Sequence, residues 1–295
     1  MKPPPFHYHD PRTLADAVEL LSRLDNAKLL AGGQSLMPML NMRFVLPDHV
    51  VDLNRVDGLS YIRESDGALA IGAMTRQREL EFSDLVRARL PLLHEAILQV
   101  GHRQTRNRGT IGGSLAHLDP AAELVSIAAA YDAVVTVTGP HGARDIAFAE
   151  FPAAYMTPAI EPHEILTAVR IPSWPQGHGH AFIEFSRRHG DFAIVSAAAL
   201  LQADSAGRVA RASLTLGGLG AAPVRMREVE HALIGEPPGD ELFRNLCESC
   251  RSLEAVDDIH ASAGYRQHLA AVLARRALVK AAERLAGGAA PRSVH

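Results

Sequence analysis

The spacing of apolar and polar residues divides the first part of the chain into short helices and strands. Apolar residues recur at helical spacing over 14–24, after Thr13 and Asp16, which form a start similar to a capping box. Three further elements are predicted: a buried strand over 28–31, a short helix over 36–43 and a strand over 49–53. Because strands and helices alternate, this segment predicts a small parallel sheet.

The middle of the chain combines a hairpin signal with helices and two later strands. Residues 59–73 alternate around the turn residues 65–67. Thr75 is expected to cap a short helix, and Pro91 to begin another. Strands are predicted over 133–138 and 164–171.

The clearest boundary is the turn-rich segment 174–180, which has no hydrophobic period. Three strands and then three helices are predicted after it. The strands are expected over 181–187, 193–202 and 209–216, and the helices over 225–234, 240–253 and 263–285. His178 and His180 lie in the boundary segment without carboxylate or cysteine partners, so we interpret them as linker residues rather than metal ligands.

Composition narrows the class of protein. The 295 residues suffice for two or three domains, and 47% hydrophobic with 21% charged residues indicates a globular chain. A net charge of −3 and few aromatic residues disfavour nucleic acid as a partner. The sequence has no apolar run of about 20 residues and no signal-peptide pattern at its start, so no membrane span and a cytoplasmic location are expected.

Two stretches, 30–36 and 110–115, share one order of residues: an apolar residue or run, a glycine pair and then small polar residues. Glycine has no Cβ and adopts positive φ, so consecutive amides can turn toward one anion. Asp119 and Pro120 follow, and predict the N-cap and first residue of a helix that ends near Tyr131. Two such motifs favour a pyrophosphate, which has two charged groups to hold.

A pair of ordinary tight turns is the alternative interpretation of these motifs. Arg103, Arg106 and Arg108 precede the second glycine pair and favour a phosphate nearby, although they also suit a solvated rim or a partner surface. His117 is open to two interpretations, a hydrogen bond to a cofactor or a cap of the local turn.

The sequence gives little support for other kinds of binding or catalytic site. The chain has no phosphate-binding P-loop, no dinucleotide fingerprint after its first strand, no zinc-protease motif and no nucleophile elbow. Cys247 and Cys250 are spaced C-x-x-C within a helix-like run, which favours packing over metal or redox chemistry. We therefore predict no catalytic pair and no metal site.

Four segments in order carry a resemblance to the FAD-binding medium subunit of the molybdenum hydroxylases, the family of carbon monoxide dehydrogenase, quinoline oxidoreductase and xanthine dehydrogenase. They are 31–36 (AGGQSL), 106–114 (RNRGTIGGS) with Asp119-Pro120, 187–193 (RRHGDFA), and 265–278. The likeness covers essentially the whole chain.

The resemblance implies an α+β fold in three parts. A two-part FAD-binding domain is expected, with a small α/β N-terminal piece over 1–56 and a larger α+β piece over 57–176. A C-terminal flavoprotein domain over 177–295 would consist of an antiparallel sheet with a three-helix bundle.

The resemblance also implies where FAD binds. The pyrophosphate would be held by Ala31, Gly32, Gly33, Gln34 and Ser35, and by Thr110, Ile111, Gly112, Gly113 and Ser114. Asp119 and Glu123 would place the sugar or adenine end, Leu166 would pack near the adenine, and Asp191 and Phe192 would lie near the isoalloxazine ring. His117 is included as a cofactor-binding candidate. Non-covalent binding is expected, because both cysteines are remote in sequence from the glycine motifs.

Departures from the family pattern concern the flavin ring rather than the phosphates. Thr105 stands where an apolar residue is common, and Ile183 and Glu184 occupy positions where some relatives place a lysine near the flavin.

The implied function is electron transfer. A large partner subunit would carry the molybdopterin cofactor and select the substrate, and a small partner with [2Fe–2S] clusters would pass electrons to this FAD and on to an external acceptor. The complex would be a dimer of heterotrimers. Two alternatives remain: a stand-alone FAD-dependent oxidoreductase of the same scaffold, and a non-catalytic nucleotide-binding module.

Overall fold

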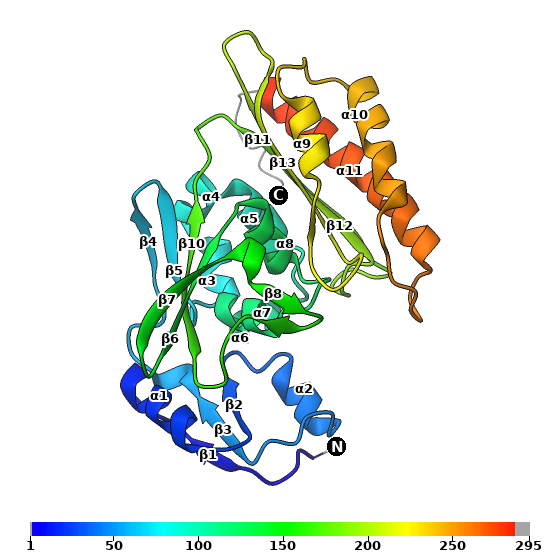
Figure 1. The fold of residues 1–295 in the computed structure, drawn as a ribbon. Coiled ribbons are helices and arrows are strands. Elements are labelled where there is room, and N and C mark those ends of the chain that lie inside the picture. Colours follow the sequence, from blue (N-terminus) through cyan, green and yellow to red (C-terminus); the bar gives the residue numbers. More distant parts are fainter. Residues whose placement is uncertain (1, 287–295) are drawn as a thin grey trace.

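Three main sheets follow one another along the described part of the chain (Figure 1). The computed structural model describes residues 2–286, so the end of the expected third domain, 287–295, lies outside the described residues. The first sheet is parallel, in the order β1-β3-β2, as the alternation of strands and helices predicted. Its strands are β1 (His7–His9), β2 (Ala27–Leu30) and β3 (His49–Asp52).

Helix α1 (Leu14–Arg23) covers this sheet and begins at a side-chain cap. The Thr13 hydroxyl accepts a hydrogen bond from the Asp16 amide at 3.1 Å. Its buried face contributes Ala17, Val18 and Leu21 to a small core with Val51. Strand β1 was not predicted, because a three-residue strand with a mostly polar sequence carries no hydrophobic period.

The middle sheet is antiparallel, in the order β4-β5-β10-β6-β7. Its strands are β4 (Ile62–Ser65), β5 (Ala68–Gly72), β6 (Val134–Gly139), β7 (Gly142–Ala147) and β10 (Ile165–Pro172). Strand β10 is the last of these strands in the sequence and lies at the centre of the sheet. It pairs with both β5 and β6, so it joins the β4–β5 hairpin to the β6–β7 hairpin. A short pair, β8 (Pro152–Ala154) and β9 (Thr157–Pro158), lies apart from it.

Short helices connect β5 to β6 and fill the centre of the molecule. They are α3 (Gln77–Phe82), α4 (Asp84–Arg89), α5 (Pro91–Ile97), α6 (Arg103–Arg108), α7 (Ile111–His117) and α8 (Glu123–Ala130). Together with one face of the middle sheet they form the largest hydrophobic core. Pro91 begins α5 as predicted.

Two predicted helix starts were wrong. Thr75 does not cap α3: its hydroxyl is bonded to the backbone of Tyr61, and Arg76 is the residue before the helix. Helix α8 begins at Glu123 rather than at Pro120. The Asp119 carboxylate instead accepts from the Ala121 amide at 2.9 Å, which closes a turn ahead of the helix.

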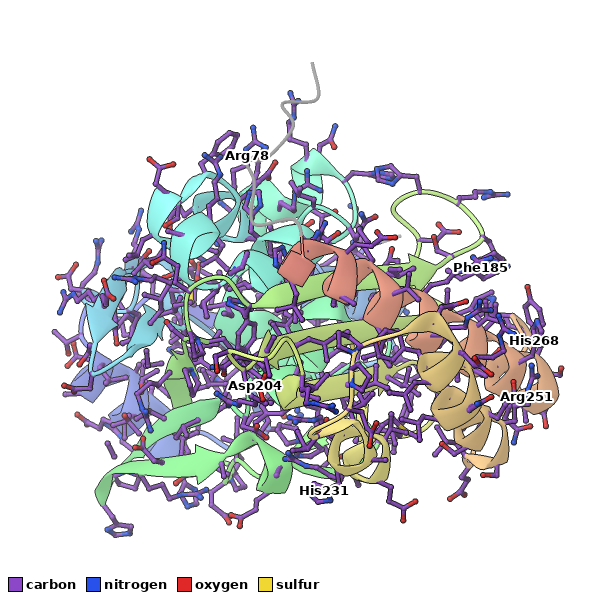
Figure 2. All side chains as sticks on the ribbon, turned by 90° about the horizontal axis from the view of Figure 1, so that it is seen from above. Arg78, Phe185, Asp204, His231, Arg251 and His268 are labelled. Carbon is purple, nitrogen blue, oxygen red and sulfur yellow. The ribbon has the colours of Figure 1, made fainter. Side chains whose placement is uncertain are left out.

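The C-terminal sheet is antiparallel and lies between two layers of helices. Its strands are β11 (Gly179–Phe185), β12 (Val195–Ala203), β13 (Val209–Gly217) and β14 (Val224–Arg225). One face packs on α9 (Arg227–Leu233), α10 (Asp240–Cys247) and α11 (Ala263–Ala286), which confirms the three predicted helices (Figures 1 and 2). The other face contributes Phe182, Ala198 and Leu200 to the core of the middle part.

Cys247 and Cys250 are buried in the core between this sheet and its helices, as the packing interpretation predicted. His180 is part of β11, so its interpretation as a linker residue was wrong.

Ion pairs fix the middle part against the C-terminal part. Glu95 of α5 meets Lys280 and Arg284 of α11 at 2.5 and 2.7 Å, and accepts from the Phe182 amide. Arg284 also donates to the carbonyl of His180. These contacts hold the middle part and the C-terminal part in one arrangement.

Candidate nucleotide-binding site

The two glycine motifs lie against each other, although many residues separate them in the chain. A Cβ added to Gly32 would collide with the carbonyl of Arg108 and lie 2.7 Å from the Cα of Gly109. A Cβ added to Gly113 would lie 3.3 Å from that of Ala31. The backbones can approach this closely because glycine has no side chain.

A chain of hydrogen bonds joins the two motifs. Asn54 donates from Nδ2 to the carbonyl of Ala31 at 2.9 Å. Arg76 donates from Nη2 to Asn54 Oδ1 at 2.5 Å and from Nη1 to the carbonyl of Arg108 at 2.6 Å. Neither Asn54 nor Arg76 was singled out from the sequence, because each stands alone without a recognisable motif.

The first motif leaves a row of backbone amides free. Gly33 has φ of +74°, which turns the chain between β2 and α2 (Leu36–Asn41). Within residues 2–286, the amides of 32–35 donate to no protein acceptor. Consecutive free amides beside small residues form a cradle for an anion, so this motif fits a phosphate group.

The second motif is arranged differently from the prediction. Gly112 and Gly113 lie inside α7, neither has positive φ, and Thr110 caps the helix by accepting from the Gly113 amide at 3.0 Å. The Ile111 and Gly112 amides donate to the carbonyls of Thr75 and Ala73. The expectation that consecutive amides of this pair face an anion was therefore wrong, and its glycines serve close packing instead.

The three arginines before this motif have different environments. Arg106 is buried, donates to Glu81 at 2.9 Å and to the carbonyl of Val100 at 3.0 Å, and so holds α6 in place. Arg103 and Arg108 are exposed. Only these two remain available to an anion outside the protein.

His117, Asp119 and Glu123 gather where α7 leads into α8. His117 is the last residue of α7, at the opposite end of the helix from Thr110, and burial lowers its pKa. Glu123 is only 4% exposed. Burial raises the pKa of Glu123 to about 7, and the charge of Asp119 adds to the effect.

The remaining candidates lie on two other elements. Leu166 of β10 is a core residue, paired with Val137 of β6. Asp191 and Phe192 belong to the loop between β11 and β12, and Phe192 is 60% exposed. Gly190 in this loop has φ of +86°, and a Cβ there would lie 2.6 Å from His102 Nδ1. The loop of the C-terminal part therefore lies on the residue that precedes α6, beside the second motif.

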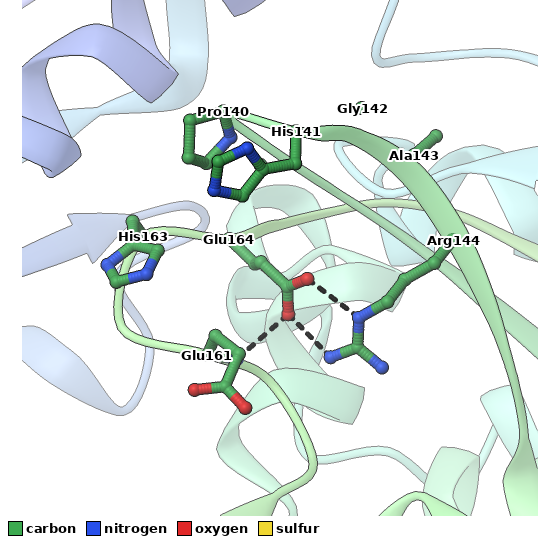
Figure 3. A pocket seen from close by; sticks show the side chains of 9 residues that line it. Pro140, His141, Gly142, Ala143, Arg144, Glu161, His163 and Glu164 are labelled. Carbon is green, nitrogen blue, oxygen red and sulfur yellow. Dashed lines mark hydrogen bonds and ion pairs between the residues drawn. The ribbon is translucent and has the colours of Figure 1, made fainter.

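A pocket lies away from these motifs, at the turn between β6 and β7 (Figure 3). It holds about 170 Å³, and Arg144 and Glu164 form a two-point ion pair in it at 2.7 and 2.6 Å. A dinucleotide needs a larger site. Among residues 2–286, three or more metal-ligating side chains nowhere gather as a metal site. In the same range, no helix is both long and apolar enough to cross a membrane.

Comparison with known families covers almost the whole chain. Residues 4–174 match the family described as the FAD binding domain in molybdopterin dehydrogenase. Residues 180–281 match the CO dehydrogenase flavoprotein C-terminal domain.

Individual relatives support the same family. The chain is 43% identical to the 6-hydroxypseudooxynicotine dehydrogenase complex subunit alpha of Paenarthrobacter nicotinovorans, over 96% of this chain and 97% of that protein. It is 38% identical to the carbon monoxide dehydrogenase medium chain of Afipia carboxidovorans, over 96% and 99%.

Solved structures give the same result. Carbon monoxide dehydrogenase from Hydrogenophaga pseudoflava matches with a TM-score of 0.93 and 36% identity, over 96% of this chain and 99% of that one. Quinoline 2-oxidoreductase from Pseudomonas putida 86 matches with a TM-score of 0.92 and 34% identity, over the same shares. The chain therefore belongs to the family of FAD-binding subunits of molybdopterin dehydrogenases.

Proposed function

We propose that this chain is the FAD-carrying electron-transfer subunit of a molybdenum-containing hydroxylase or dehydrogenase. The observation that carries the proposal is the packing of Gly32 on Arg108 and Gly109, which joins the two glycine motifs of the family into one site. FAD supplies reversible uptake and release of electrons when it is bound, and the protein positions it and adjusts its potential.

The first motif is the proposed pyrophosphate cradle, through the free amides of residues 32–35. Ala31 and Gly113 leave room beside it because their facing surfaces carry at most one methyl group. The exposed guanidinium of Arg108 adds positive charge at its edge. The complete proposed set is Ala31, Gly32, Gly33, Gln34, Ser35, Thr110, Ile111, Gly112, Gly113, Ser114, His117, Asp119, Glu123, Leu166, Asp191 and Phe192.

The two later segments are proposed to hold the rest of the cofactor. The loop with Asp191 and Phe192 reaches across from the C-terminal part to His102, so it is suited to the isoalloxazine end. Leu166 lies within the core, where it supports the adenine end from below rather than covering it. The division into 1–56, 57–176 and 177–295 is part of this proposal, and each segment contains one of the three main sheets.

The proposed partners are a large subunit with the molybdopterin cofactor and a small subunit with [2Fe–2S] clusters, in a dimer of heterotrimers in the cytoplasm. Relatives named as a medium chain or as a subunit of a complex support an assembly of several chains. The two cysteines of this chain support separate carriers as well, since a conventional [2Fe–2S] cluster takes four thiolates.

The test uses the chain alone and then with its partners. The purified chain is loaded with FAD and mixed without oxygen with N-heterocycles, aldehydes or carbon monoxide, while the flavin absorption band is followed. We expect no rapid bleaching until the co-purified partner subunits are added. Rapid bleaching by one of these compounds without another protein would instead identify a stand-alone flavoenzyme. If the chain bound no FAD at all, the proposed cofactor would be wrong as well.

A further inference from the structure

A row of polar residues crosses the C-terminal sheet on the face that packs against α8. Glu184 of β11 is paired with Ser196 of β12, and Ser196 with Gly217 of β13. Phe182, two positions before Glu184, lies in the core of the middle part. Because side chains alternate along a strand, Glu184 points to that same face.

Helix α8 presents a matching pair of polar residues to this row. Glu123 and Ser126 lie one turn apart on one face of the helix. A Cβ added to Gly217 would collide with the Ser126 hydroxyl and lie 2.6 Å from the Ser196 hydroxyl. Both hydroxyls therefore converge on one point between the helix and the sheet.

These groups are buried without partners. Ser126 and Ser196 are fully buried, and within residues 2–286 neither hydroxyl has a hydrogen-bond partner. The same holds for Oε2 of Glu184, which is also shielded from solvent. Since buried polar atoms are nearly always paired, this group is suited to exchange protons or to receive a polar ligand.

Neither the carboxylate of Glu123 nor that of Glu184 has an ion-pair partner in the described part of the chain. Asp119, in the turn before α8, adds a third carboxyl group near the pair. Strands β12 and β13 contribute hydroxyls here, those of Ser196 and Thr215.

His117 of α7, whose pKa burial lowers, faces the charge of Asp119. The charged groups of α5 and α11 nearby are already paired. Glu95 of α5, which reaches the Phe182 amide, is neutralised by Lys280 and Arg284. Arg266 of α11 donates to the carbonyl of Gly218 and pairs with Asp258.

Burial raises the pKa of both carboxyl groups. Burial raises the pKa of Glu184 to about 8, and the charge of Glu123 adds to the effect. With the pKa of Glu123 at about 7, the pair is partly protonated at neutral pH. The charge of Glu123 therefore influences the protonation of Glu184.

We propose that Glu123 and Glu184 form a carboxyl pair that takes up a proton from solvent when the bound FAD takes up electrons. This inference rests on the proposed function. Glu123 belongs to the helix that follows α7, and Glu184 stands two residues before the loop 186–192, so the pair lies between two proposed cofactor-binding segments. Phe185, which separates Glu184 from that loop, is labelled in Figure 2.

The reduction of FAD and the protonation of the carboxyl pair are coupled electrostatically. Electrons come from a reduced iron–sulfur protein, and the proton comes from solvent onto a carboxylate oxygen, with no bond formed to the cofactor. Negative charge arriving nearby raises the proton affinity of a carboxylate. The pair is only partly protonated at neutral pH. A rise in its proton affinity therefore increases the fraction of the pair that carries a proton.

The experiment compares the FAD-loaded chain with its E123Q, E184Q and double variants. Each is reduced electrochemically at neutral pH while a pH indicator dye follows proton uptake and infrared spectra follow the carbonyl band of protonated carboxyl groups. For the wild type we expect a growing carboxyl band and a larger proton uptake than for the double variant, by a sizeable fraction of one proton per FAD. E150Q, an exposed carboxylate on the short helix 148–150, should behave as the wild type.

The outcomes separate the two proposals. Equal proton uptake in all variants, with no change in the carboxyl band, overturns the coupling while FAD binding and reduction still support the proposed function. The proposed carboxyl pair is also overturned if infrared titration of the FAD-free chain shows both carboxyl groups ionised at neutral pH. A chain that binds no FAD overturns both proposals. If the double variant does not fold, the two single variants carry the same comparison.

Discussion

Gly32 packs directly on the backbone of Arg108, so that the loop after β2 and the helix before the second glycine pair meet without a side chain between them. Close approach of this kind needs glycine at one of the two positions. The contact places the free amides of the first motif beside α7, which is the arrangement that the proposed pyrophosphate site requires.

Gly32→Ala should therefore weaken FAD binding strongly. The added methyl group collides with the Arg108 carbonyl and forces the two motifs apart. We expect a fall in FAD affinity of at least about a hundredfold, roughly 3 kcal/mol. Gly220→Ala is the matched control, because a Cβ there meets no atom within 4 Å. Isothermal titration with FAD checks both, and equal affinities would mean that the contact does not shape the site.

Gly113→Val should lose FAD while the fold persists. Its side chain would meet the Thr110 hydroxyl and extend toward Ala31, in the gap between the motifs. Bound flavin is read from the absorption spectrum, and far-ultraviolet circular dichroism should stay close to that of the wild type. Gly264→Val, also within a helix but with open space around its Cβ, controls for the β-branched residue itself. Normal flavin content in the Gly113 variant would leave this face of α7 outside the site.

Asn54→Ala should weaken FAD binding moderately. The amide of Asn54 links the Ala31 carbonyl to Arg76, which in turn holds the Arg108 carbonyl. Loss of this link leaves the partly buried Ala31 carbonyl and Arg76 guanidinium each without one hydrogen-bond partner, and we expect about a tenfold fall in affinity. Asn245→Ala, at an exposed position of α10, should bind FAD like the wild type. The prediction fails if the two variants have the same dissociation constant.

Glu184→Gln should stabilise the FAD-free chain at alkaline pH. Burial raises the pKa of Glu184 from 4.5 to about 8 in the folded protein. A carboxyl with a raised folded-state pKa favours folding at low pH, and this contribution is lost as the pH rises through the folded-state value. The melting temperature of the variant relative to the wild type should therefore rise between about pH 5 and about pH 9. Glu150→Gln provides the control, and a difference that is constant with pH would contradict the shift.

FAD should be released by acid without breaking a covalent bond. Cys247 and Cys250 are buried between the C-terminal sheet and its helices, which keeps both thiols out of the proposed site. His117 lies at the end of α7 away from Thr110. Acid precipitation should leave the yellow colour in the supernatant. Colour that stays with the pellet would show a covalent flavin.

The sequence by itself determined the order of the elements and the family. Hydrophobic periods are local, so α1, the β4–β5 hairpin and the three C-terminal helices were predicted from neighbouring residues alone. The glycine pairs are local as well, and their order with the later segments was enough to identify the cofactor. Predictions of single helix starts at Thr75 and Pro120 were wrong. The Thr75 hydroxyl binds the backbone of Tyr61, and the Asp119 carboxylate closes a turn on the Ala121 amide ahead of the helix.

Only the tertiary structure decided what the polar residues do. Arg103, Arg106 and Arg108 are equivalent in sequence, yet Arg106 is buried against Glu81 because α6 packs on α3. Asn54 and Arg76 become a bridge only when the segments after β3 and β5 bring them beside the glycine motifs. Glu123 lies on α8, which packs on the face of the C-terminal sheet to which Glu184 points, and burial in this region raises the pKa of both groups. Contacts between residues far apart in the chain leave no local period, so no reading of neighbouring residues reveals them.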